Sequence, residues 1–164
     1  MGAPGVEIRP ARWATHRAQI EAVRRSVFIV EQGVPEDEEW DDADRGCWHT
    51  LAVTPKRDAV GTARLEPTGK IGRVAVLPQY RGTGIGGAMI GHLVDLARTL
   101  GLTQVYLNSQ SSAIGFYERL GFRAEGPEFE EVGIPHRRMN LRIVQRDEHQ
   151  AERHRNPEHP HDRR

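Results

Sequence analysis

Several features are scarce or missing in this sequence, and each absence excludes a class of protein. Cys47 is the only cysteine in 164 residues, so an internal disulfide framework is excluded. No apolar run approaches the roughly 18 residues that a membrane span requires. The first ten residues, MGAPGVEIRP, have neither the basic nor the apolar region of a secretory signal. We therefore expect a cytoplasmic protein with no membrane partner.

Net charge is also missing. The 23 basic and 23 acidic residues cancel, so no global field draws the chain to nucleic acid or to an anionic membrane. No basic stripe accompanies Trp13, Trp40 or Trp48, as base stacking on nucleic acid would need. We expect no nucleic-acid partner, and the length fits one domain.

Apolar residues run out at the carboxyl end. After Val144, the stretch from Gln145 to Arg164 has Ala151 as its only aliphatic residue and cannot bury a core. This break predicts a folded domain over residues 1–144 and a disordered, charged His/Arg-rich tail over residues 145–164. The spacing of the tail histidines matches no defined metal site, so we expect no metal.

The spacing of apolar and turn residues predicts a mixed α/β order of elements. Strands are expected at residues 6–9, 49–54, 59–66, 70–77 and 104–108, at Phe122, and at residues 136–144. Helices are expected at residues 15–30 with Thr15 as the cap, at 84–100 with Gly101 as the end, and at 112–120. The acidic stretch 35–45 is expected to be a loop.

The loop RGTGIGG, residues 81–87, joins an expected strand to an expected helix. Consecutive backbone N–H groups and the helix dipole make such a junction an anion site, and phosphate is the expected guest. Each glycine inside a helix costs roughly 1 kcal/mol relative to alanine, which is tolerated where a ligand must approach the backbone. The structural alternative is a tight turn with close helix packing.

Two phosphate-binding families fit this loop poorly. A P-loop NTPase needs a lysine and a serine or threonine after the last glycine, but Ala88 and Met89 follow Gly87. Gly82, Gly84 and Gly87 satisfy the dinucleotide pattern G-x-G-x-x-G, which leaves an NAD(P)-dependent oxidoreductase as an alternative. Against it, the next expected strand ends in Asn108, where an acidic residue would take a ribose hydroxyl.

A third family fits at two places. The run RVAVLPQYRGTGIGGAMI resembles the coenzyme A signature (Q/R)-x-x-G-x-(G/A) of the GCN5-related N-acetyltransferases (GNAT), met here by Arg81, Gly84 and Gly86. The run NSQSSAIGFYERLGF resembles the second signature of the same family at the expected distance. VRRSVFIVEQGVPEDEEWDDAD and EVGIPHRRM are similar to segments of the ElaA and YjcF-like acetyltransferases within it.

The resemblance implies the GNAT fold, a mixed and mostly antiparallel sheet with a splayed central strand pair and flanking helices. It also implies acetyl-CoA as the donor. The backbone of Val74, Ala75 and Val76 would pair with the pantetheine arm, and Asn108 would border the gap for the thioester. Phe116 is expected on the cofactor side. The pyrophosphate would be held by the backbone of Arg81, Gly82, Thr83, Gly84, Ile85 and Gly86.

The implied reaction is direct attack of an amine on the acetyl thioester without a covalent enzyme intermediate. Tyr117 corresponds to the general acid that protonates the leaving thiolate, and its structural alternative is a packing aromatic beside Phe116. A base must also deprotonate the amine. Glu31 and His49 are the candidates, each with a structural alternative as a polar partner within the fold.

The acceptor is an amine whose identity the residues leave open. The acidic residues between Glu36 and Asp44 would attract a cationic amine, or are a solvated loop. His136 is a candidate for the acceptor site, and Arg24 is expected to be an ion-pair partner. A nucleophilic pair of Cys47 with His49 is not expected. A non-catalytic CoA-binding module is the alternative to the enzyme, and the resemblance allows a homodimer.

Overall fold

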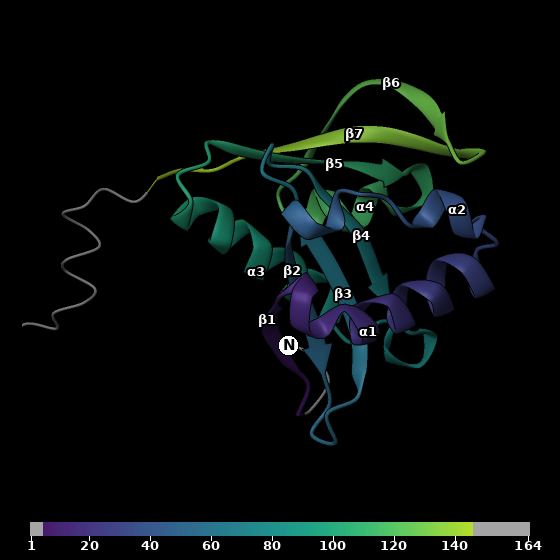
Figure 1. Cartoon of the computed structure of the whole chain (residues 1–164). Coiled ribbons are helices and arrows are strands. Elements are labelled where there is room, and N and C mark those ends of the chain that lie inside the picture. Colours follow the sequence, from purple (N-terminus) through teal and green to yellow (C-terminus); the bar gives the residue numbers. More distant parts are fainter. Residues whose placement is uncertain (1–4, 146–164) are drawn as a thin grey trace, which may run out of the picture.

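Two antiparallel sheets form the framework of the computed structural model, which describes residues 5–145 (Figure 1). Apart from Gln145, the expected tail lies outside these residues. The larger sheet has the order β1-β2-β3-β4, with bounds Glu7–Ala11, Trp48–Val53, Ala59–Leu65 and Ile71–Val76. The smaller sheet has the order β5-β7-β6, with bounds Gln104–Gln110, Ile134–Arg142 and Arg123–Glu131. The prediction of a mixed, mostly antiparallel α/β fold is confirmed.

Strands β4 and β5 meet at one end and then diverge. Lys70 and Tyr106 form an isolated parallel bridge, in which the Tyr106 N–H donates to the Gly69 carbonyl at 3.0 Å. Within residues 5–145, no further strand pairing joins β4 to β5. The smaller sheet therefore lies across the end of the larger one (Figure 1). The splayed central strand pair implied by the resemblance is present.

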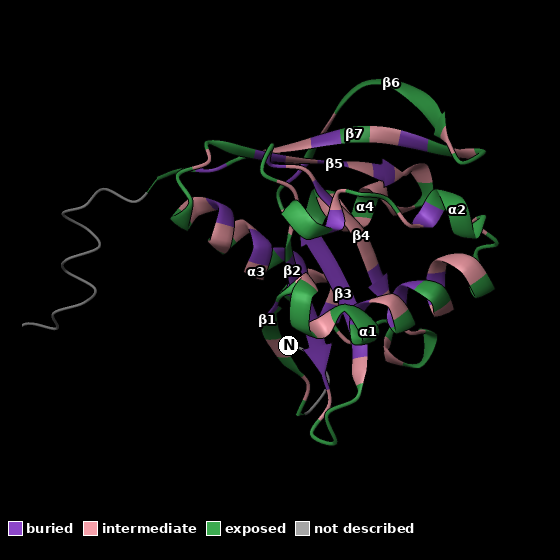
Figure 2. Ribbon diagram, in the orientation of Figure 1, coloured by how far each residue is buried: buried purple, intermediate pink, exposed green. Residues whose placement is uncertain are grey.

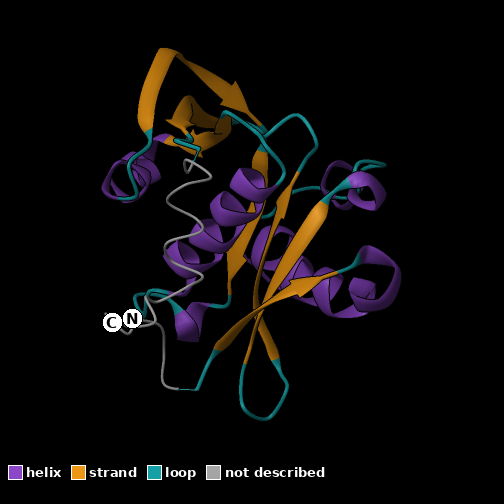
Figure 3. Ribbon diagram, turned by 90° about the vertical axis from the view of Figure 1, so that its left-hand side faces the viewer, coloured by secondary structure: helices purple, strands orange, loops and turns teal. Residues whose placement is uncertain are grey.

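Two long helices cover opposite faces of the larger sheet (Figures 2 and 3). Because neighbouring residues of a strand face opposite ways, β2 contributes to both cores. Leu51 packs with Ile20 of α1, Trp13–Arg24, whereas Ala52 belongs to the cluster built on α3, Ile85–Thr99. The α3 cluster is the larger core and holds the buried Met89 and other residues from both sheets. No helix in residues 5–145 is both long and apolar enough to cross a bilayer.

The ends of the helices test the expected capping residues. Gly101 ends α3 as expected, with φ of +81° and the Leu102 N–H donating to the Ala97 carbonyl at 3.0 Å. The prediction of Thr15 as a cap was wrong, because α1 begins at Trp13 and its N-cap residue is Arg12. The first helix also changes character after Arg24, where a π-helical segment, Arg25–Glu31, continues it. Such widened turns are frequent at functional sites.

The acidic stretch was expected to be a loop, and this was wrong. It contains the short helix α2, Glu36–Glu39, and a 3₁₀ turn, Asp44–Gly46. Arg24 orders it: this residue is 0 % exposed, with Nε 2.8 Å from Glu39 Oε1 and Nη1 2.6 Å from Asp44 Oδ1. Arg24 is thus the expected ion-pair partner. Because its partners lie 15 and 20 residues away, local composition did not reveal this structure.

Residues 112–120 were expected to form a single helix. They are divided between a 3₁₀ turn, Ser111–Ala113, and the helix α4, Ile114–Arg119. The helix leads directly into β6 through Gly121, which has φ of +97°. This arrangement packs Tyr117 against the α3 cluster, next to the splayed strands.

Candidate active site

The glycine loop after β4 leads into the start of α3. Gly82 and Gly84 have φ of +75° and +86°, values that residues other than glycine rarely adopt. In the described part of the chain, the N–H groups of residues 82–87 have no hydrogen-bond acceptor. A Cβ added to Gly82 would meet no atom within 4 Å, so a ligand has room beside the backbone. Free N–H groups at a helix start are the kind of backbone that can receive an anion such as a phosphate.

Arg81, the first residue of this loop, contacts the protein itself. Its Nε donates to the Val76 carbonyl at 3.0 Å, and Nη2 donates to Glu31 Oε2 at 2.6 Å. This guanidinium lowers the pKa of Glu31. A carboxylate with a lowered pKa is a weaker proton acceptor, and Glu31 does not line the cavity described next. The geometry gives Glu31 the role of fastening the glycine loop to the end of the π-helical segment.

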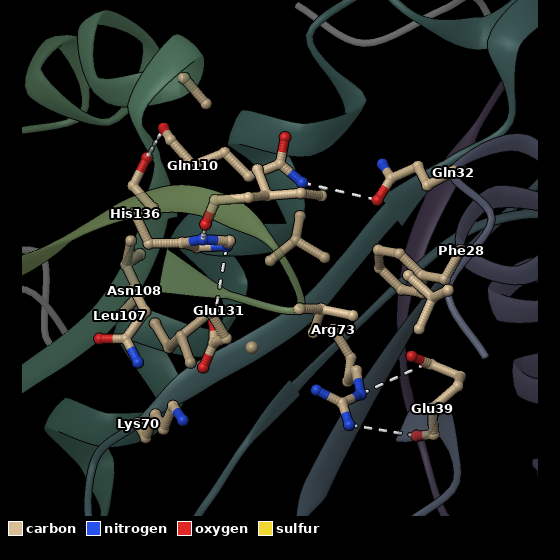
Figure 4. A pocket seen from close by; sticks show the side chains of 18 of the residues that line it. Phe28, Gln32, Glu39, Lys70, Arg73, Leu107, Asn108, Gln110, Glu131 and His136 are labelled. Carbon is tan, nitrogen blue, oxygen red and sulfur yellow. Dashed lines mark hydrogen bonds and ion pairs between the residues drawn. The ribbon is translucent and has the colours of Figure 1, made fainter. Parts of the chain in front are cut away.

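A cavity of about 450 Å³ opens where β4 and β5 diverge (Figure 4). Four of the expected site residues line it: Val74, Asn108, Tyr117 and His136. The first two come from the diverging strands, Tyr117 from α4, and His136 from β7. The sequence therefore identified one residue on each of four elements that the fold brings to a single cavity.

Other expected site residues lie outside the cavity lining. Ala75 is buried against Val23 and Val27 on the face of β4 that α1 covers. Phe116 packs beside the start of α3, where a Cβ added to Gly86 would be 3.4 Å from the Phe116 ring. Both positions border the glycine loop or β4 without facing the cavity. Their expected roles at the cofactor stay predictions.

Tyr117 lies between two other aromatic rings. Its ring centroid is 4.9 Å from that of Phe116 and 5.9 Å from that of Phe122, both in edge-to-face contact. Burial raises the pKa of Tyr117 to about 12. The phenol therefore keeps its proton at neutral pH, as a general acid must before it reacts.

His49 is a buried structural ring in this arrangement. It is 2 % exposed, its Nε2 lies 2.8 Å from the Asp44 carbonyl oxygen, and it stacks on Trp13 at 5.5 Å. Burial lowers its pKa, and it does not line the cavity. The nearby Cys47 thiol donates to the Ala43 carbonyl, and burial raises its pKa to about 11. A thiol of such high pKa is a poor nucleophile, consistent with the expectation of no Cys47–His49 pair.

The cavity wall includes two residues that the sequence analysis missed. Arg73 has φ of +51° at an irregularity in the pairing of β3 with β4, and its Nε lies 3.3 Å from Glu39 Oε1 (Figure 4). Burial raises the pKa of Glu39, although Arg73 and Arg24 oppose this effect. The left-handed backbone conformation of Arg73 could not be predicted from the alternation of apolar and polar residues along the strand. Glu39 was visible only as part of an acidic run.

The opposite wall carries His136 and Glu131. His136 is 7 % exposed, with Nδ1 2.7 Å from the Ile134 carbonyl oxygen and Nε2 3.5 Å from Glu131 Oε2 (Figure 4). Glu131 ends β6 and pairs with Ile134 of β7, so the hairpin itself brings these groups together. In the described residues, no group of three or more His, Cys, Asp or Glu side chains is placed to hold a metal ion.

Comparison with known proteins gives one consistent result. Residues 20–143 match the family "Acetyltransferase (GNAT) domain". The chain is similar to the uncharacterised N-acetyltransferase YjcF of Bacillus subtilis, with 36 % identity over 71 % of this chain and 86 % of the relative. It is 39 % identical to YyaT of the same organism over 74 % of this chain and 85 % of that one. The crystal structure of Escherichia coli ElaA is similar with a TM-score of 0.73 and 25 % identity, over 82 % of this chain and 98 % of ElaA.

Proposed function

The chain belongs to the GNAT acetyltransferase family, and on this premise we propose that it moves an acetyl group from acetyl-CoA to a primary amine by direct attack in a ternary complex. One observation carries the proposal. The unbonded N–H groups at the start of α3 and the cavity between β4 and β5 are connected by β4 itself, whose cavity side has no partner strand in residues 5–145. A long donor with a phosphate end and a thioester end fits such a path.

The donor half of the site relies on backbone groups. The N–H groups of residues 82–87 would hold the pyrophosphate, and the edge of β4 at Val74 and Val76 would pair with the pantetheine arm. The thioester would then lie in the gap bordered by Asn108. The Arg81 side chain is already bonded to Glu31 and to the Val76 carbonyl. Arg81 would therefore help to bind the donor through its backbone and by fixing the position of the loop.

The acceptor half lies on the other side of the cavity. Its charged lining includes Glu38, Glu131 and Lys70, together with the paired Glu39 and Arg73. The carboxylates favour a cationic amine, and Lys70 offers a contact to an acceptor that also carries an anionic group. We propose a small-molecule or peptide amine as the acceptor, the substrate class on which GNAT enzymes act.

Tyr117 is proposed as the general acid. It lines the cavity next to the gap between the strands, and its phenol is protonated at neutral pH. As the nitrogen–carbon bond forms and the carbon–sulfur bond breaks, this phenol would give its proton to the departing sulfur. Holding the two substrates together in the ternary complex further accelerates such a reaction.

The first test is calorimetric titration of the full chain with acetyl-CoA, with NADH as a control. We expect acetyl-CoA to bind and NADH not to bind. Gly84→Val, which forces a branched side chain into φ of +86°, should abolish binding. Gly101→Val is the matched control, because it imposes the same strain at φ of +81° at the far end of α3 and should leave binding intact.

Turnover is tested by release of free CoA thiol with a panel of primary amines. Transfer to any of them supports the enzyme. Binding of acetyl-CoA without transfer to any amine would favour the non-catalytic CoA-binding module. Binding of NADH alone would favour the oxidoreductase and overturn the proposal.

Two further expectations belong to this proposal. We place the protein in the cytoplasm, where acetyl-CoA is formed and used, and cell fractionation tests this. A homodimer is the oligomeric state that the family resemblance allows. Light scattering on the purified chain would separate a monomer of 18.5 kDa from a dimer.

A further inference from the structure

His136 has a fixed orientation and a fixed tautomer. Its Nδ1 lies 2.7 Å from the carbonyl oxygen of Ile134, and a carbonyl oxygen can only accept a hydrogen bond. In the neutral imidazole, Nδ1 therefore carries the proton and donates to Ile134. The other nitrogen, Nε2, then has a free lone pair. Because His136 lines the cavity from β7, this lone pair belongs to a cavity wall.

The Glu131 carboxylate faces Nε2, with Oε2 at 3.5 Å. An ionised carboxylate also only accepts hydrogen bonds. Two acceptors that face each other at this distance have no hydrogen between them, so the pair is incomplete until a donor joins it. An ammonium group has several N–H donors and can serve both acceptors at once. With the imidazole neutral, a protonated amine placed between the two groups would complete the pair.

The neighbouring strands hold the His136 imidazole in place. Phe129 is the direct cross-strand partner of His136 on β6, and the two rings stack at 6.1 Å. On the other side, Gln110 of β5 pairs with His136. The charged groups that share the cavity with this imidazole come from β6, α2 and the region of β4, and they are Glu131, Glu38, Glu39, Lys70 and Arg73. Of these, Glu39 and Arg73 pair with each other.

We propose that His136 is the general base of the reaction and that Glu131 holds the incoming ammonium beside it. This inference rests on the proposed function. It replaces Glu31 and His49 as candidate bases, since neither of them lines the cavity. The ammonium gives one proton to Nε2, and the freed lone pair forms the bond to the acetyl carbon. His136 then releases that proton to solvent. Tyr117 gives its proton to the sulfur, and the second proton, which leaves the nitrogen as the amide forms, replaces it on the Tyr117 phenol. One proton thus goes to solvent and one ends on the CoA thiol.

The tautomer can be tested without any substrate. Long-range nitrogen–proton NMR spectra distinguish the two neutral imidazole forms, and His136→Gln identifies the His136 signals among the eight histidines. We expect the form protonated at Nδ1 in the full chain. A His136 protonated at Nε2 in the neutral state would overturn the proposal, because the nitrogen facing Glu131 would then have no lone pair for the amine.

The role as base is tested with two amines of matched size, ethylamine and 2,2,2-trifluoroethylamine. Fluorine makes the second amine far less basic, so at neutral pH it is largely unprotonated and needs little help from a base. With acetyl-CoA saturating, His136→Gln should lower the transfer rate to ethylamine by about a hundredfold, within the usual range for a lost general base. The loss with trifluoroethylamine should be less than about threefold on the same principle.

His16→Gln, the same substitution on α1 outside the cavity lining, is the matched control and should change neither rate. Equal losses with the two amines would give His136 a structural role and overturn the inference. Full retention of both rates in His136→Gln would overturn it as well. Calorimetry separates this outcome from failure of the proposed function: His136→Gln should bind acetyl-CoA as the wild type does, whereas failure of the wild type to bind would reject the function itself.

Discussion

Glu31 and Arg81 are fifty residues apart in the chain and meet in a two-point ion pair, with Nη–O distances of 2.5 and 2.6 Å. The pair fastens the end of the π-helical segment to the loop that precedes α3. Since the π-helical segment leads to Gln32 on the acceptor wall, this one contact links the acceptor side of the cavity to the proposed pyrophosphate loop.

Glu31→Gln should therefore weaken acetyl-CoA binding and spare the chemical step. We expect the Kd for acetyl-CoA to rise several-fold, with kcat close to that of the wild type. Stability should change little, because both side chains are substantially exposed and solvent screens their ion pair. Calorimetry and steady-state kinetics measure the two effects. A loss of kcat by two orders of magnitude with unchanged Kd would instead identify Glu31 as the base.

Tyr117→Phe should separate catalysis from cofactor binding. The ring and its contacts with Phe116 and Phe122 are kept, so we expect unchanged affinity for acetyl-CoA. The loss of the proton donor should lower kcat by roughly a hundredfold or more. Tyr106→Phe on β5 removes the same hydroxyl group, here 3.4 Å from Thr68 Oγ1, and should have no such effect. A large loss of acetyl-CoA affinity in Tyr117→Phe would contradict the assignment.

His49→Gln should weaken the fold more than the reaction. The substitution disturbs the buried contact with the Asp44 carbonyl and the stacking on Trp13, so we expect a loss of about 1–3 kcal/mol in the free energy of unfolding. The folded variant should retain kcat within a few-fold. Urea unfolding and kinetics at a temperature where the variant is folded are the measurements. Unchanged stability with a kcat reduced a hundredfold would restore His49 as a candidate base.

The Asp41 carboxylate makes stability depend on acid pH. Arg64 donates to both of its oxygens at 2.8 Å, and this contact lowers the pKa of Asp41 to about 2 from an ordinary value of 3.8. Because the folded-state pKa is the lower one, the stabilisation is fully present above pH 4 and is lost as pH falls toward 2.

Asp41→Asn should therefore flatten the decline of the unfolding free energy between pH 5 and pH 2. Urea unfolding at several pH values measures this slope. Asp42→Asn is the matched control, because no ion pair of Asp42 is present in the described residues. Identical slopes in Asp41→Asn and the wild type would contradict the pKa shift.

Val132 is strained at the tip of the β6–β7 hairpin. It has φ of +52° and is followed by Gly133 with φ of +73°, the two-residue turn in which asparagine is preferred at the first position. A left-handed conformation costs a β-branched residue about 1–2 kcal/mol. Val132→Asn should raise the free energy of unfolding by about 1 kcal/mol. Val30→Asn, an exposed valine outside the left-handed region, should not, and equal effects of both substitutions would count against strain.

Features of the fold that depend on residues close together in the sequence were predicted well. Alternation and turn residues located every strand except β6, which was expected at Phe122 and instead runs over Arg123–Glu131. Gly82 and Gly84 marked the loop whose positive φ values the structure contains. Asn108, Tyr117 and His136 were placed at the site through the family resemblance, and all three line the cavity. These features are local, or belong to motifs that keep the same spacing throughout the family.

What the sequence did not reveal depends on contacts between distant segments. Nothing near Glu31 shows that Arg81 neutralises it, and nothing near His49 shows that the Asp44 carbonyl occupies its ring nitrogen. The meeting of His136 with Glu131 depends on the register of β6 with β7, which an irregularity between Glu125 and Phe129 shifts. A pattern of residues along one strand cannot contain that information.

The buried ion pairs around Arg24 also constrain how this protein can diverge. One network of ion pairs joins Arg24, Glu39, Asp44 and Arg64. Replacing one member leaves a buried charge without its partner, which lowers the free energy of unfolding by about 3–5 kcal/mol. We therefore expect substitutions at these positions to occur together. Glu39 also lines the cavity, so one part of the cavity wall is subject to the same constraint. Descendants of this chain with new acceptor preferences should therefore differ at Gln32, Val34 and Val132, which line the same cavity without belonging to the linked set.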